Sequence, residues 1–106
     1  MLITTSENIA GRRVVETKGE VFGVVVRSRG LGGNIAARLR SVVGGVIKEY
    51  TELLEEARQD AVDRMVEHAQ SKGADAIIMM RFDSSEMGTT MSEIVAYGTA
   101  VVTEPA

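Results

Sequence analysis

Hydrophobic and polar positions change their spacing twice along this chain of 106 residues. Two β-branched runs, residues 12–18 and residues 20–28, come early and predict strands. Gly19 separates them, so we expect Lys18-Gly19-Glu20 to turn the first strand into the second as a hairpin. Residues 2–4 give a weaker strand signal.

From residue 34 onward, apolar side chains recur mostly every three or four residues, which is the period of a helix. The stripe comprises Ile35, Leu39, Val42, Val46, Ile47, Tyr50, Leu54, Ala57, Ala61, Met65 and Ala69. Two adjacent glycines cost about 2 kcal/mol in a helix interior. We therefore predict a short helix over about residues 34–43, a corner at Gly44-Gly45 and a long helix over about residues 48–72. Asn34 is the expected N-cap, and Gly73 the expected residue after the helix end.

Two further strands are predicted near the end of the chain. Residues 74–84 are almost continuously apolar in their first half, whereas residues 92–103 alternate. One face of the alternating strand carries Glu93, Val95, Tyr97, Thr99 and Val101, and the other carries Ile94, Ala96, Gly98, Ala100 and Val102. The small residues of the second face would let a helix approach the sheet closely.

The element order β-β-α-α-β-β predicts an α+β fold, with a sheet of about four strands and a short and a long helix packed on one face. Residues 76–80 and residues 24–26 are apolar on both faces of their strands. Helices on one side cover one face only, and large exposed apolar patches are rare in monomers. We therefore expect copies of this chain to cover one another in a homo-oligomer.

The composition narrows the classes of function. The chain has no Cys, which excludes disulfides, thiolate catalysis and Cys-based zinc sites. A net charge of −3 gives no general attraction to nucleic acid or to an anionic membrane. No segment approaches the ~20 apolar residues that span a bilayer, and the first residues lack a signal-peptide pattern. We expect one domain, residues 1–106, in the cytoplasm.

A glycine cluster after the second strand raises the question of a nucleotide site. Gly30 and Gly32 fit two positions of a dinucleotide fingerprint, but Ile35 occupies the third, and no Gly-Lys-Ser/Thr is present. We interpret the cluster as a strand-to-helix connection. Arg27 and Arg29 beside a helix N-terminus leave a small-anion site as the alternative.

Metal ligands are scarce in this sequence, and no cofactor is expected. His68 is the one histidine, and Arg64 and Lys72 lie one helical turn on either side of it, where they repel a cation. Met87 and Met91 are four residues apart and could hold Cu(I), but we interpret them as packing residues.

The long helix is rich in carboxylates, which we interpret as a solvated face with pairs such as Glu55–Arg58 and Asp60–Arg64. No set of nucleophile and base is visible, so an enzyme is the least supported class.

Several motifs resemble the YbjQ family over about residues 8–102. They are Arg27-Ser28-Arg29, Val43-Gly44-Gly45, Lys48, Tyr50-Thr51, Ala57-Arg58, Gly73-Ala74-Asp75-Ala76 and Tyr97-Gly98-Thr99-Ala100-Val101. The resemblance implies an α+β subunit in a ring-like homopentamer and no established activity. The family is also labelled heavy-metal-binding, a label that the ligand content of this sequence does not support.

The candidate ligand or interface residues are Arg27, Ser28, Arg29, Arg40, Gly44, Gly45, Lys48 and Tyr50. We expect the polar ones to line a contact between subunits. The alternative is a binding module that holds a small anion or a metal ion at subunit boundaries. No catalytic residue and no metal ligand is assigned.

Overall fold

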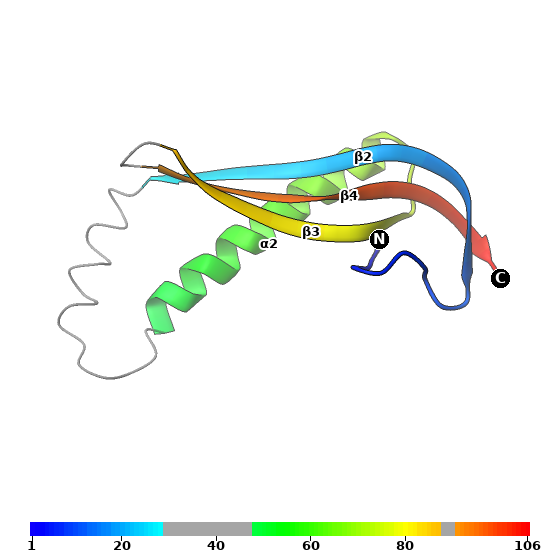
Figure 1. Ribbon diagram of the computed structural model, residues 1–106, viewed down its shortest axis with the longest axis horizontal. Helices are drawn as coiled ribbons and strands as arrows, with labels where there is room; N and C mark the ends of the chain where they lie inside the picture. Colours follow the sequence, from blue (N-terminus) through cyan, green and yellow to red (C-terminus); the bar gives the residue numbers. More distant parts are fainter. Residues whose placement is uncertain (29–47, 88–90) are drawn as a thin grey trace.

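The computed structural model describes residues 1–28, 48–87 and 91–106. It contains strands β1 (Leu2–Ile3), β2 (Arg12–Ser28), β3 (Ala76–Met87) and β4 (Met91–Pro105), and helix α2 (Lys48–Ser71). The sheet order is β1-β3-β4-β2, with β1 parallel to β3 and the other neighbours antiparallel. Figure 1 shows α2 on one face of this sheet, running obliquely from below β3 to beside β2. The fold is α+β, with a mixed four-stranded sheet and one long helix in the described part of the chain.

The predicted long helix is confirmed, and its end is a Schellman motif. The Gly73 N–H donates to the Gln70 carbonyl at 3.0 Å, and the Ala74 N–H donates to the Ala69 carbonyl at 3.1 Å. This geometry needs a left-handed residue after the helix, and Gly73 has φ +78°. The predicted short helix, its N-cap Asn34 and the corner at Gly44-Gly45 lie outside the described residues.

The predicted hairpin at Gly19 is wrong, because residues 12–28 form one strand. Thr17 pairs with Val101 and Gly19 with Ala100, which leaves Lys18 as the extra residue of a β-bulge. Gly19 has φ +104°, a conformation that suits the bulge as well as it would suit a turn. Figure 1 shows β2 as one continuous, bent strand beside β4, and the two strands stay paired from Arg12 to Ser28. The fourth strand of the sheet is the short β1.

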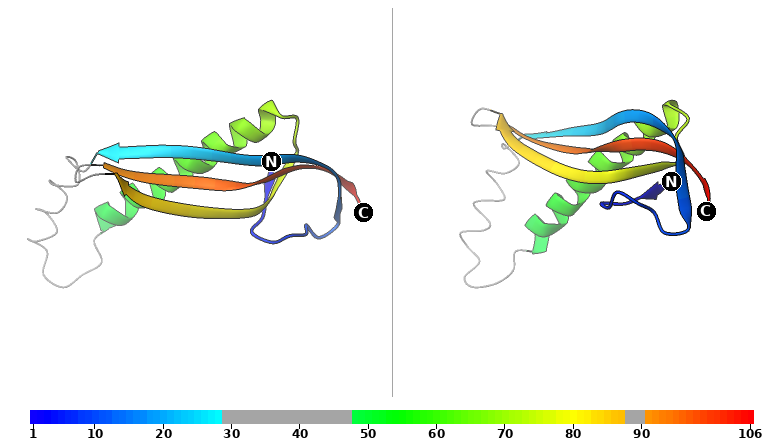
Figure 2. Two further views of the ribbon diagram at one scale, coloured as in Figure 1. Left: turned by 45° about the horizontal axis from the view of Figure 1, so that its top comes forward. Right: turned by 45° about the vertical axis from the view of Figure 1, so that its right-hand side comes forward.

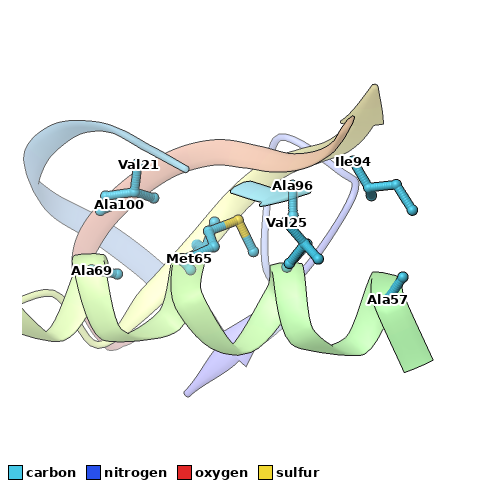
Figure 3. Close-up of a cluster of buried hydrophobic side chains, with 10 residues drawn as sticks. Val21, Val25, Ala57, Met65, Ala69, Ile94, Ala96 and Ala100 are labelled. Atoms are coloured by element: carbon cyan, nitrogen blue, oxygen red, sulfur yellow. The ribbon is translucent and has the colours of Figure 1, made fainter. Parts of the chain in front are cut away.

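The core lies between α2 and the sheet. One row of the helix, Ala57, Ala61, Met65 and Ala69, is buried against Val21, Val25, Ile94, Ala96 and Ala100 of β2 and β4. Figure 3 shows Met65 pointing from the helix toward the sheet, with small side chains around it. The prediction that the small-residue face of β4 receives the helix is confirmed.

The closest approach of helix and sheet is at Gly23 of β2. A Cβ atom at Gly23 would lie 2.0 Å from the Ala61 carbonyl oxygen and 2.5 Å from the Met65 amide nitrogen. Such distances leave no room for a side chain, so the helix backbone rests directly on the strand backbone at this point.

β3 also has a bulge, at Met79 and Met80, which together stand opposite Gly98. Met79 has φ +56°, which is uncommon for a residue with a side chain. The N-terminal segment supports the bulge: the Met79 N–H donates to the Ser6 carbonyl and the Met80 N–H to the Thr4 carbonyl. This segment thereby continues the edge that β1 begins.

Candidate functional site

The structure ties the predicted residue Arg27 to the helix. Its Nη2 donates to Oδ2 of Asp60 at 2.6 Å. The positive charge of Arg27, which we expected to attract a small anion, is therefore already balanced by a carboxylate of the same chain. Ser28 is the last residue of β2, and Lys48 and Tyr50 belong to the first turn of α2. Arg29, Arg40, Gly44 and Gly45 lie outside the described residues.

The helix charges also pair differently from the prediction. Glu55–Arg58 and Asp60–Arg64 are not ion pairs among the described residues. Asp60 instead holds Arg27, while Arg64 donates to the Val24 carbonyl at 3.1 Å. The charged side of α2 therefore makes sheet contacts and is not merely a solvated face.

A groove of about 550 Å³ lies between the first half of α2 and the paired ends of β3 and β4. Its lining comprises Leu54, Arg58, Phe82, Asp83, Ser84, Ser85, Glu86, Ser92, Glu93 and Ile94. The guanidinium carbon of Arg58 lies 5.1 Å from the ring centroid of Phe82, which is a cation–π distance. Among the described lining residues, Asp83 and Glu93 place two carboxylates beside the one guanidinium of Arg58, which disfavours an anionic ligand. Sequence reasoning missed this site, because its α2 residues lie far along the chain from its strand residues.

The sheet face opposite α2 carries exposed apolar side chains. Strand alternation places Phe22, Val24 and Val26 there, because Val21, Gly23 and Val25 face the helix. Phe22 pairs directly with Tyr97, and Val24 pairs with Val95. Phe22, Val26 and Tyr97 are 48%, 49% and 43% exposed. We call these five residues, Phe22, Val24, Val26, Val95 and Tyr97, the open sheet face.

The open sheet face ends where the sheet bends. Val101 and Thr103 belong to the same alternating series of β4 but are buried. Figure 2 shows the N-terminal segment and the bent part of β2 at this end of the sheet. Ala76 and Ile77 are also fully buried within the protomer, whereas Met79 is exposed. The prediction that all of residues 76–80 need outside cover is thus wrong in its first half. Exposed apolar side chains also lie on other elements, including Phe22 of β2 and Tyr97 of β4.

Comparisons with known proteins match this fold and sequence. A YbjQ family model, described as "Putative heavy-metal-binding", matches residues 1–104. The chain belongs to the YbjQ family. UPF0145 protein BRADO6695 of Bradyrhizobium sp. (strain ORS 278) is 65% identical over 106 residues, covering 100% of this chain and 96% of the relative.

A UPF0145 protein of Sulfurisphaera tokodaii is 58% identical over 102 residues, covering 96% of this chain and 90% of the relative. A crystal structure of a protein of unknown function from Pediococcus pentosaceus, assigned to the DUF74 family, superposes with a TM-score of 0.64. It covers 98% of each chain at 18% identity, so it supports the fold alone. The resemblance seen in the sequence is confirmed.

The residues present do not fit the heavy-metal description of the YbjQ family. Nδ1 of His68 accepts the Phe22 N–H at 3.2 Å, and its ring packs edge-on against the Phe22 ring. In residues 1–28, 48–87 and 91–106, no group of three or more His, Cys, Asp or Glu side chains is placed to hold a metal ion. The remaining residues, 29–47 and 88–90, contain no Asp, Glu, His, Cys or Met in the sequence. No step is assigned to a metal.

Among the described residues, no helix has the length and hydropathy needed to cross a membrane.

Proposed function

We propose that this YbjQ-family protein is a cytoplasmic homo-oligomeric domain, a ring-like pentamer by family resemblance, with no reaction of its own assigned. The open sheet face is the observation that carries the proposal. It holds two of the chain's four aromatic residues in one cross-strand pair, and Phe22 and Tyr97 stay 48% and 43% exposed although the His68 ring meets the Phe22 ring edge-on. Aromatic side chains bury 150–250 Å² each and dominate the energetics of many interfaces.

Substituting Tyr97→Asp tests the role of the open sheet face. We expect the wild-type protein to show a multiple of the 11.4 kDa mass by light scattering at micromolar concentration. Tyr97→Asp places a charge in the apolar contact, so the variant should dissociate to smaller species. We expect its dissociation constant to be at least ten-fold higher than that of the wild type. Ala10→Asp, on the exposed N-terminal loop, is the matched control and should keep the wild-type mass. A monomeric wild type would defeat the proposal. A Tyr97→Asp variant with the wild-type mass would show that the contact between subunits does not involve the open sheet face.

The second candidate is a small-ligand binding module, which the groove between α2 and the β3–β4 hairpin favours. Asp83 and Glu93, together with the apolar Leu54, Phe82 and Ile94, suit a positively charged organic ligand. We expect phosphate, Zn²⁺ and Cu(I) to leave the thermal midpoint unchanged. A bound ligand at 100 times its dissociation constant would stabilise the protein by about 2.7 kcal/mol. A higher thermal midpoint in the presence of phosphate or a metal ion would instead support a site at subunit boundaries.

A further inference from the structure

The outer edge of β2 is covered by three side chains of α2. β2 is the last strand of the described sheet, so within residues 1–28, 48–87 and 91–106 no strand neighbours its outward backbone groups. Nη1 of Arg64 donates to the Val24 carbonyl at 3.1 Å, and Nζ of Lys72 donates to the Glu20 carbonyl at 3.0 Å. Between them, the Phe22 N–H donates to Nδ1 of His68 at 3.2 Å. Three successive outward positions of the strand are thus occupied by side chains from one helix.

The match between helix and strand has a geometric reason. Four residues of a helix rise about 6 Å, and two residues of a strand rise about 6.6 Å. Arg64, His68 and Lys72 are spaced by four, and the edge residues Glu20, Phe22 and Val24 are spaced by two. When a helix runs antiparallel to an edge strand, every fourth helix residue can therefore lie beside every second strand residue and reach its outward backbone groups. The ion pair of Asp60 with Arg27 continues the same row.

The chemistry of each side chain fits its partner. Arg64 and Lys72 have only donors and meet carbonyl oxygens, whereas Nδ1 of His68 is an acceptor and meets the Phe22 N–H. The row lies next to the buried row of Ala61, Met65 and Ala69, so core packing fixes its position over the strand.

An open strand edge is a template for pairing with another chain, and proteins commonly block such edges. We propose that Arg64, His68 and Lys72 cap the β2 edge against strand addition and so keep self-association away from this edge. The inference builds on the proposed self-association and assigns a use to the single histidine. His68 is a positioning residue, which holds the strand edge through the Phe22 amide.

Amide hydrogen exchange tests the cap within one protomer. We expect the Phe22 amide of the wild-type protein to exchange slowly although it lies on a sheet edge. His68→Ala removes the acceptor and should speed its exchange at least ten-fold. His68→Gln retains an acceptor oxygen and should restore most of the protection. Equal exchange of the Phe22 amide in the wild type and His68→Ala would overturn the inference.

A triple variant tests the consequence for assembly. Arg64→Ala, His68→Ala and Lys72→Ala together should give species larger than the wild-type oligomer by light scattering, with increased intermolecular β-structure by infrared spectroscopy. Glu56→Ala, Glu67→Ala and Gln70→Ala together, at exposed positions of the same helix, are the control and should keep the wild-type mass. A triple variant of wild-type mass would overturn the proposed block.

If the triple variant does not fold, the exchange of the Phe22 amide in the two His68 variants decides the question. A monomeric wild type with a protected Phe22 amide would defeat the proposed self-association and leave the cap standing. The two proposals therefore fail on different measurements.

Discussion

Gly23→Ala should lower the free energy of unfolding by about 3 kcal/mol. The new Cβ would lie 2.0 Å from the Ala61 carbonyl oxygen and 2.5 Å from the Met65 amide nitrogen. Both atoms belong to the helix backbone, which cannot rotate aside as a long side chain would. The helix must move away from β2, and the loss spreads to the core contacts beneath it. Urea denaturation followed by circular dichroism measures the change.

Gly11→Ala is the control for this prediction. Gly11 has φ +76°, and a Cβ there would meet nothing within 4 Å. Its cost should therefore be the backbone strain alone, about 1 kcal/mol. If Gly23→Ala lowers the free energy of unfolding no more than Gly11→Ala does, the helix and strand backbones are not in direct contact at Gly23.

Met65→Ala should also destabilise the fold by about 3 kcal/mol, within the range for large-to-small core changes. Met65 is fully buried and is among the largest buried side chains of the described residues. The residues around it are mostly alanine and valine, which are too small to fill the space it leaves (Figure 3). Thermal and urea denaturation measure the loss.

Met91→Ala is the matched control, since it removes the same atoms from a side chain that is 41% exposed. Surface substitutions of this kind usually change stability by less than about 0.5 kcal/mol. Similar losses for both variants would mean that the protein buries Met91 in an interface, which the mass of the Met91→Ala variant would show.

These two positions also govern the surfaces assigned to function. Gly23 and Met65 set the distance between α2 and the sheet, and α2 carries both the edge-capping row and the groove residue Arg58. A helix displaced by Gly23→Ala should therefore loosen the hydrogen bond between His68 and Phe22. Stability and edge protection are expected to fall together in that variant.

The long helix and the β4 alternation could be predicted because their signals are local. A stripe such as Ala57, Ala61 and Met65 repeats within one segment, and Gly73 marks the helix end by its own backbone freedom. The two faces of β4 follow from alternation alone, and the face with Ala96 and Ala100 is the buried one. The family followed from short motifs spread over nearly the whole chain.

The course of β2 could not be predicted, because Gly19 has the same conformational freedom in a turn and in a bulge. Pairing with the length of β4 decided between them, and that pairing joins residues more than 60 positions apart. The groove was missed for a similar reason, since Leu54, Phe82 and Ile94 share no local pattern.

The sequence by itself determined which segments form helix and strands, which side of each is apolar, and that metal ligands are scarce. The tertiary structure decided which strand lies at the edge, that the charged row of α2 covers it, and that Phe22 and Tyr97 pair on an exposed face of the sheet. Periodicity is a property of neighbours along the chain, whereas an edge or an open face depends on what lies beside a strand in space.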